Sequence, residues 1–288
     1  MPRYEIYGHT ETGRVRARNE DHILVGRFVK NHGAVGLWLE PDDDFLAAYG
    51  LLLAVADGIG GQRHGATASR LALITLERQF YGTVKKPTLD AFQQALDAAL
   101  QSANAAVRDA AQGNPDLAGM GCTLAGVCLT AGGYLVFGCG DSRVYRSRHA
   151  MLKPLTEDDT VGQREVRLGL LDPASARELG RTRTLVGWVG GDRFTSHLQP
   201  GPELRPGDRL LVCTDGLYDL VGDDDLAAAL NDDRAPLDRL GQQLARRALD
   251  AAGDDNLSLI LLRVTPDGGP AADAVSHNAD ELPEETTR

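Results

Sequence analysis

Four aspartates lie at the ends of short apolar segments in this chain. They are Asp57, Asp141, Asp215 and Asp255. The clearest case is Asp57, which follows the apolar residues 51–56 and precedes the glycine-rich residues 58–61. A short apolar segment bounded by turn residues is typical of a buried β-strand. Each acid therefore stands at a strand end, and we expect all four to share one pole of a sheet structure.

Carboxylates that gather at one pole repel one another, and a bound cation relieves that repulsion. Hard divalent ions such as Mg²⁺ and Mn²⁺ prefer oxygen ligands of this kind. A single Asp-Gly pair is more often a turn than a metal ligand. The repetition of the pattern along the chain is what predicts a divalent-metal site.

The composition excludes several classes of function. The chain has 288 residues, 42% of them hydrophobic, and a formal net charge of -11. Nucleic acid is not an expected partner, because phosphate backbones attract basic surfaces. No apolar segment approaches a membrane-spanning length, and no apolar signal segment follows the N-terminus. The four cysteines form no Cys-x-x-Cys pair, which argues against a zinc site. Three of them lie within apolar segments, which predicts buried thiols in a reducing compartment. We expect a cytoplasmic monomer.

The elements that would position the acids follow from apolar periodicity. Helices are predicted over residues 66–74, 88–113, 226–230 and 237–249. Strands are predicted over residues 51–56, 123–130, 134–138, 144–147, 209–214 and 257–264. Helices thus occur in two pairs separated by blocks of strands, which favours an α+β fold of antiparallel sheets covered by helices over a doubly wound parallel fold.

The domain organisation is expected to be simple. Residues 1–264 contain no linker and predict a single domain. Residues 265–288 are acidic and rich in Pro and Gly, so we expect a disordered tail. Residues 41–44, Pro-Asp-Asp-Asp, predict a hairpin turn.

Seven short motifs in a fixed order give the chain a family resemblance. They are residues 13–21, 57–61, 119–123, 140–145, 155–159, 208–217 and 254–258. Together they resemble the metal-dependent Ser/Thr protein phosphatases of bacterial type (PPM, type 2C), over roughly residues 5–264. The resemblance implies a four-layer α-β-β-α sandwich with two central antiparallel sheets flanked by helices, and a flap over about residues 156–191.

The resemblance also implies the residues of the site. The implied metal ligands are Glu20, Asp57, the carbonyl of Gly58, Asp141, Asp215 and Asp255. Asp57 would bridge two ions, Mn²⁺ or Mg²⁺, and Asp141 with Asp215 would form a weaker third site. Arg16 would bind the substrate phosphate through its planar fork of donors. Asp21, which either binds a metal-held water or buttresses Glu20, and Asn256 would support the ligands.

The implied activity is hydrolysis of phosphoserine and phosphothreonine in proteins by a hydroxide that bridges two metal ions, opposing a Ser/Thr protein kinase. Phosphorylated proteins would then be the partners. Two alternatives stay open: an inactive relative that serves as a regulatory binding module, and a phosphatase of small phosphate esters. The retained acids and Arg16 argue against the first. For the flap arginines, which are Arg164, Arg167, Arg177, Arg181 and Arg183, binding of acidic segments and simple solvation are equally open.

Overall fold

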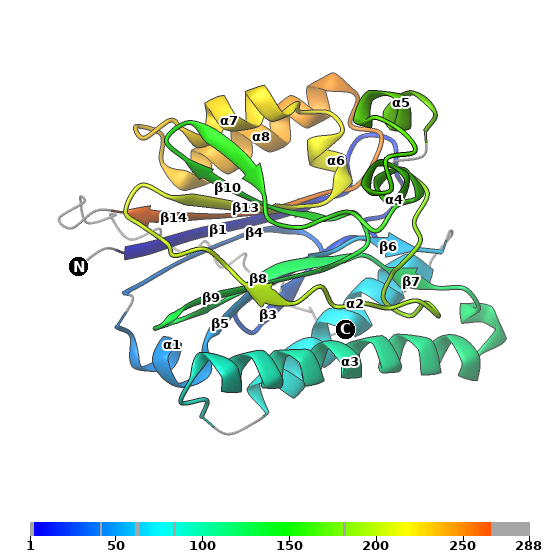
Figure 1. Ribbon diagram of the computed structural model, residues 1–288, viewed down its shortest axis with the longest axis horizontal. Helices are drawn as coiled ribbons and strands as arrows, with labels where there is room; N and C mark the ends of the chain where they lie inside the picture. The colour runs from blue at the N-terminus through cyan, green and yellow to red at the C-terminus, as the bar shows by residue number, and fades with distance from the viewer. Residues whose placement is uncertain (1–2, 41, 61–63, 83–84, 181–182, 266–288) are drawn as a thin grey trace, which may run out of the picture.

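Two antiparallel β-sheets packed face to face form the centre of the computed structural model (Figure 1). The structure describes residues 3–40, 42–60, 64–82, 85–180 and 183–265. The first sheet runs β11 (Met151–Pro154), β10 (Arg143–Arg148), β13 (Arg209–Cys213), β14 (Leu257–Thr265), β1 (Arg3–Glu11) and β4 (Gly33–Leu39). The second runs β12 (Gln199–Pro200), β9 (Gly133–Cys139), β8 (Leu124–Thr130), β5 (Leu51–Ala56), β2 (His22–Val25) and β3 (Phe28–Lys30).

Helices cover the outer face of each sheet, which confirms the predicted four-layer sandwich (Figure 1). The layer on the second sheet contains α2 (His64–Tyr81) and α3 (Leu89–Gly113). The predicted cap of α3 forms, because the Thr88 hydroxyl accepts a hydrogen bond from the Ala91 N–H at 3.2 Å. The apolar stripe of α3 is buried against the sheet through Phe92, Leu96 and Leu100.

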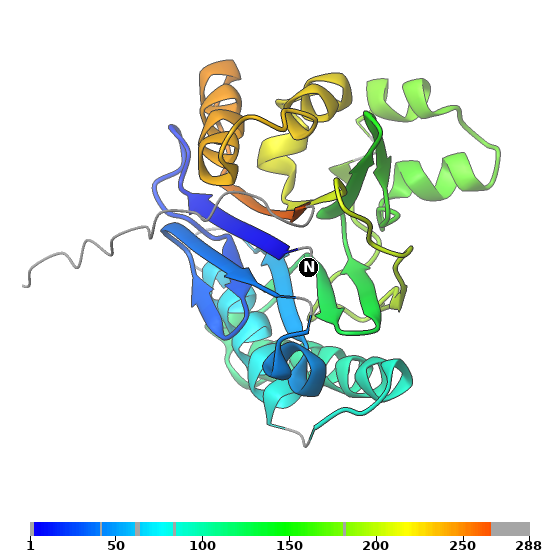
Figure 2. The same cartoon turned by 90° about the vertical axis from the view of Figure 1, so that its left-hand side faces the viewer.

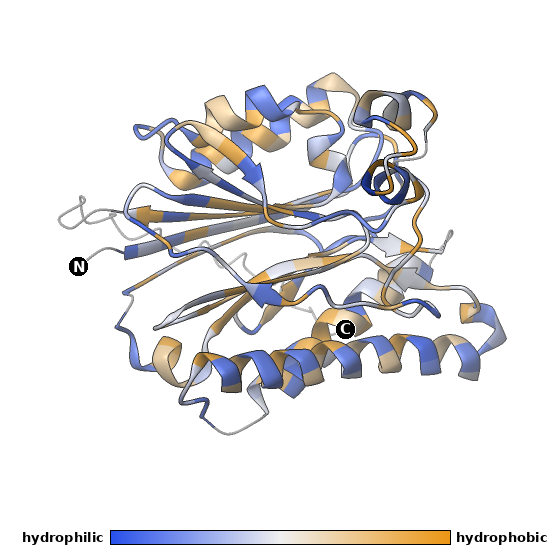
Figure 3. Ribbon diagram, in the orientation of Figure 1, coloured by the Kyte–Doolittle hydropathy of each residue, from blue (hydrophilic) through white to orange (hydrophobic). Residues whose placement is uncertain are grey.

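The layer on the first sheet contains α7 (Asp223–Leu230) and α8 (Leu237–Ala251). Helix α8 buries Leu240, Leu244 and Ala248 and exposes polar residues on its other side (Figure 3). Between the two sheets lies a separate apolar core to which both contribute, for example Leu53 from β5 and Ile260 from β14. Three stacked apolar layers therefore hold the sheets at a fixed separation.

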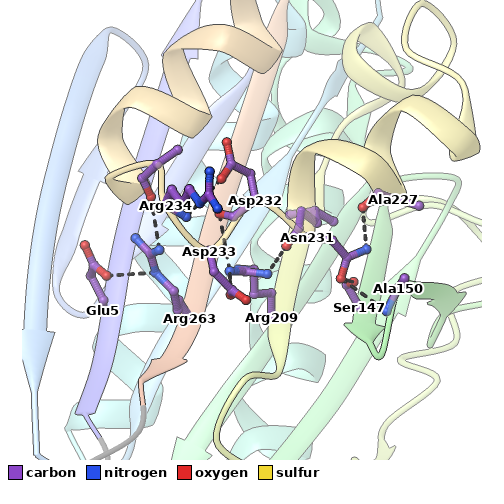
Figure 4. Close-up of polar contacts among 12 residues, drawn as sticks. Glu5, Ser147, Ala150, Arg209, Ala227, Asn231, Asp232, Asp233, Arg234 and Arg263 are labelled. Atoms are coloured by element: carbon purple, nitrogen blue, oxygen red, sulfur yellow. Dashed lines mark hydrogen bonds and ion pairs between the residues drawn. The ribbon is translucent and has the colours of Figure 1, made fainter. Parts of the chain in front are cut away.

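Two arginines fix the connection between α7 and α8 to the first sheet (Figure 4). The buried guanidinium of Arg209 donates to the carbonyl of Leu230, at the end of α7, and to the carboxylate of Asp233. Arg263, on the neighbouring strand, donates to the carbonyl of Ala235 at 3.0 Å. The start of α8 is thereby tied to β13 and β14 by charge-assisted bonds.

The structure bears on the predictions for the turn at residues 41–44, for the C-terminal tail and for membrane-spanning segments. Residues 42–44 do not make a hairpin turn, because the Asp43 carboxylate accepts from the N–H groups of Phe45 and Leu46 and caps α1 (Asp44–Tyr49). Strand β14 includes Thr265, and the remainder of the predicted tail, residues 266–288, lies outside the described residues. Within the described ranges, every helix is too short or too polar to cross a membrane.

Candidate active site

The strand ends that carry the four predicted aspartates lie at one end of the sandwich, at the right of Figure 1. Asp57 lies between β5 and the short strand β6 (Gly58–Ile59), which pairs with β7 (Gly121–Cys122). Asp215 opens α6 (Asp215–Tyr218), directly after β13. Asp255 precedes β14, the neighbour of β13, and Asp141 follows β9. Four acids that are distant in sequence thus share one pole, as the strand pattern predicts.

Asn256 holds the loop of the first motif against Asp255. Its carbonyl oxygen accepts the Glu20 N–H at 2.8 Å, and its amide donates to the carbonyls of Thr12 and Arg18 at 2.8 and 2.9 Å. The Ser69 hydroxyl of α2 donates to the Glu20 carbonyl at 2.5 Å. These bonds place Glu20 beside the other acids, so Asn256 lies where a supporting residue is expected.

A glycine allows Glu20 to approach Gly58. A Cβ atom on Gly65, near the start of α2, would lie 2.6 Å from both Oε2 of Glu20 and the carbonyl oxygen of Gly58. Both oxygens therefore occupy the space next to a residue that has no side chain. Any larger residue at position 65 would push apart two of the predicted ligands.

The acids act on one another electrostatically. Burial raises the pKa of Asp57 well above its usual value, and the charges of Asp21, Asp215, Asp141 and Asp255 raise it further, in that order. Burial is also the main cause that raises the pKa of Asp21 to about 7, of Asp141 to about 8 and of Asp215 to about 6. Nearby basic side chains do not offset the repulsion among these carboxylates, so their pKa values stay raised. Strongly shifted pKa values of this kind cluster at functional sites.

The donor set suits a hard divalent ion. All of the predicted ligands offer oxygen atoms, which Mg²⁺ and Mn²⁺ prefer. Buried Asp21 accepts from the Thr214 hydroxyl through Oδ2 at 2.9 Å, while its Oδ1 has no partner among the described residues. Within the described ranges, no group of three or more Asp, Glu, His or Cys side chains is arranged so that it could hold a metal ion without other ligands. Ions bound here would therefore complete their coordination with water, as Mg²⁺ usually does.

Arg16 reaches the same acids from the loop of the first motif. Its Nη2 donates to Oδ2 of Asp255 at 2.8 Å, and this hydrogen bond is the main cause that raises the arginine pKa. About half of the Arg16 side chain is exposed, at 53%, so donors remain for a ligand. Its neighbour Arg14 is instead paired with Asp250 at 2.5 Å. Arg16 is thus better placed than Arg14 to bind a phosphate.

A tyrosine and an arginine position the segment of Asp141, which the sequence analysis did not foresee. The Tyr218 hydroxyl donates to the backbone carbonyl of Asp141 at 2.8 Å. The Arg143 guanidinium lies 3.8 Å from the centre of the Tyr218 ring and makes a two-pronged ion pair with Asp158. Tyr218 lies 77 residues after Asp141 in the sequence, and no sequence pattern links the two.

We expect Tyr218→Phe to lower the free energy of unfolding by about 1 kcal/mol, because it removes one hydrogen bond and keeps the ring under Arg143. Arg143→Ala should cost about 3 kcal/mol, since it leaves the Asp158 carboxylate, whose side chain is only 11% exposed, without its partner. Urea denaturation of the two variants checks this order. Equal costs would mean that the ion pair contributes no more to stability than the hydroxyl.

The flap lies beside this site, outside the two sheets (Figures 1 and 2). It carries α4 (Val161–Arg167) and α5 (Pro173–Glu178). At its base Asp159 accepts from the Gly140 N–H at 3.0 Å and pairs with His197 at 2.8 Å. Arg183 pairs with Asp219 of the α6 end at 3.1 Å. Of the other predicted flap arginines, Arg181 lies outside the described residues.

The sequence of this chain is similar to those of known serine/threonine phosphatases. The family model of protein phosphatase 2C matches residues 40–261. The chain is 31% identical over 282 residues to the serine/threonine protein phosphatase PstP of Mycobacterium tuberculosis, covering 95% of this chain. It spans 48%, about half, of the length of that relative. The serine/threonine phosphatase stp of Listeria monocytogenes is 27% identical, with 88% of this chain and 93% of the relative covered.

Solved structures agree with the fold. The crystal structure of PstP superposes with a TM-score of 0.74 at 30% identity, covering 91% of this chain and 100% of that one. The catalytic domain of PstP in complex with two manganese ions gives a TM-score of 0.70 at 31% identity, with the same coverage of both chains. The fold, the shared motifs and the matched family model lead to one conclusion: this chain belongs to the protein phosphatase 2C family.

Proposed function

We propose that this chain removes phosphate from phosphoserine and phosphothreonine in proteins, with two divalent ions bound at the acidic pole. The proposed ligands are Glu20, Asp57, the Gly58 carbonyl, Asp215 and Asp255, with Asp141 at a third site. The observation that supports this most is the convergence of acids from segments far apart in sequence: Asp21, Asp141, Asp215 and Asp255 all raise the pKa of Asp57. A relative of 31% identity binds two manganese ions.

Bound ions would neutralise the charge of the phosphate and lower the pKa of a water molecule for attack on phosphorus. Side chains of the protein would bind the phosphate and hold the metal ligands in place. Arg16 offers a planar fork of donors to the phosphate oxygens, and Asp255 keeps the guanidinium oriented at 2.8 Å. Asn256 and Ser69 hold the Glu20 loop in position. Buried Asp21, fixed by the Thr214 hydroxyl, is placed to hold a water next to the ligands.

Steady-state turnover on phosphothreonine peptides and on p-nitrophenyl phosphate tests the proposal. We expect turnover of both with Mn²⁺, a higher kcat/KM for the peptides, and loss of all activity with EDTA. A higher kcat/KM on p-nitrophenyl phosphate would favour the alternative that the chain hydrolyses small phosphate esters. Absence of metal-dependent turnover on every substrate would leave only the alternative of an inactive relative that serves as a regulatory binding module.

Phosphoproteins are the proposed substrates, and a Ser/Thr protein kinase is the proposed opponent. A cytoplasmic location is supported by the cysteines, since all four are buried and unpaired, as thiols are in a reducing compartment. The predicted monomer can be checked by light scattering. In the described part of the chain, no helix is long and apolar enough to span a membrane.

A further inference from the structure

A cleft of about 490 Å³ lies between α8 and β1, on the outer face of the first sheet. Helix α8 lines one wall with Ala245 and with five residues that have longer side chains: Arg239, Gln242, Gln243, Arg246 and Leu249. Their spacing of i, i+3, i+4, i+7 and i+10 places them on one face of the helix. His9 and Glu11 of β1 line the opposite wall. The lining thus combines charged and amide side chains with the apolar residues Ala245 and Leu249, and it includes none of the catalytic residues proposed above.

Two arginines in the lining of the cleft have no ion-pair partner among the described residues. They are Arg239 and Arg246, and both are exposed. Glu11 is the one acid among the lining residues, and its Oε1 lies at hydrogen-bond distance, 3.1 Å, from Nε2 of His9. Nδ1 of the same histidine is buried and has no partner within the described ranges. In a chain of net charge -11, two unpaired guanidinium groups in a cleft favour an acidic ligand.

Both walls of the cleft continue into the proposed catalytic loops. Strand β1 ends at Glu11, and the chain proceeds to Arg16 and Glu20. Helix α8 ends at Ala251, four residues before Asp255. The two loops are joined, because the Arg14 N–H donates to the Gly253 carbonyl at 2.7 Å and its guanidinium pairs with Asp250 at 2.5 Å. A chain segment bound in the cleft would lie along the approach to Arg16.

We propose that this cleft binds an acidic segment of the phosphoprotein substrate, outside the phosphorylated residue; the inference rests on the proposed function. Arg239 and Arg246 are seven residues apart, which corresponds to about 10 Å along the helix axis. A segment in the polyproline II conformation rises about 3.1 Å per residue with three residues per turn, so carboxylates three residues apart lie on one face at a matching separation of about 9 Å. The two guanidinium groups would bind these carboxylates, and the amides of Gln242 and Gln243 would bind the backbone between them.

Direct binding tests the cleft without turnover. The probe is a fluorescein-labelled, unphosphorylated peptide with glutamate at every third position among glycine and serine, titrated with the full chain in Mn²⁺ and followed by anisotropy. We expect Arg239→Ala/Arg246→Ala to weaken binding about tenfold or more. The control is Arg247→Ala, because this arginine lies on the same helix and instead faces Asp225 of α7 at 3.8 Å. A peptide with glutamine in place of glutamate should not distinguish the proteins.

Kinetics then connects the cleft with catalysis. On a phosphothreonine peptide with the glutamate pattern, the double variant should raise KM about tenfold and leave kcat unchanged. On the glutamine version and on p-nitrophenyl phosphate, it should equal the wild type. Equal affinity of the double variant and the wild type for the glutamate peptide overturns the proposal, as does an equal loss in Arg247→Ala. If the wild type hydrolyses no phosphorylated substrate, the proposed function fails, and the anisotropy result still decides whether the cleft binds acidic segments.

Discussion

Asp57→Asn is expected to lower kcat by at least about 10³-fold, which corresponds to about 4 kcal/mol of activation free energy. Asp57 lies where four other carboxylates act on it, and it is the proposed bridge between the ions. The amide keeps the shape of the side chain but removes the charge that would attract both ions. Steady-state turnover of a phosphothreonine peptide in Mn²⁺ measures the loss. Near-normal kcat would refute the bridging role.

The same variant should not be less stable when metal is absent. Burial and neighbouring acids raise the pKa of Asp57 in the folded protein, so its ionised form costs stability at neutral pH, where the unfolded chain carries the charge freely. In EDTA, the Tm of Asp57→Asn should therefore equal or exceed that of the wild type. Added Mn²⁺ should raise the wild-type Tm and leave the variant nearly unchanged, because only a protein that binds the ion gains stability from it. A lower Tm in EDTA would indicate that the variant lost activity through misfolding.

The sequence was most informative where chemistry coincides with strand ends. Asp57 and Asp215 each follow an apolar segment that forms a buried strand, β5 and β13. The pattern places each acid at the end of a strand, but β5 and β13 belong to different sheets, and the face-to-face packing of the two sheets is what brings these strand ends to one pole. Glu20 offers no such signal, since it lies in a loop. Its place among the ligands was implied only by the family resemblance.

Contacts between side chains far apart in sequence escaped prediction. Nothing in the spacing indicates that Tyr218 donates to the Asp141 carbonyl, or that Asn256 accepts the Glu20 N–H. The helix α1 was missed for a local reason: an Asp run can open a turn or cap a helix, and the apolar residue Leu46, buried in the core, decides for the helix. Burial of one side chain by the tertiary fold overrides a propensity that is nearly balanced.

Gly216→Ala is the second large effect we expect. A Cβ atom at this position would lie 1.9 Å from the carbonyl oxygen of Asn256, and a backbone atom cannot move aside as a flexible side chain can. Gly216 follows Asp215, and Asn256 follows Asp255, so this close contact sets the separation of two proposed ligands. We expect the variant to lose about 3 kcal/mol or more of unfolding free energy. Urea denaturation in EDTA measures that loss.

Gly113→Ala is the matched control, because a Cβ atom at the end of α3 would meet no atom within 4 Å. Alanine is also the better helix former, so this variant should be as stable as the wild type or slightly more stable. Gly216→Ala should in addition bind Mn²⁺ more weakly even at temperatures where it is folded, since the clash separates the segments of Asp215 and Asp255. Wild-type stability with weakened Mn²⁺ binding would mean that the segments move apart at little cost. Unchanged values of both would show that this contact does not hold the acids together.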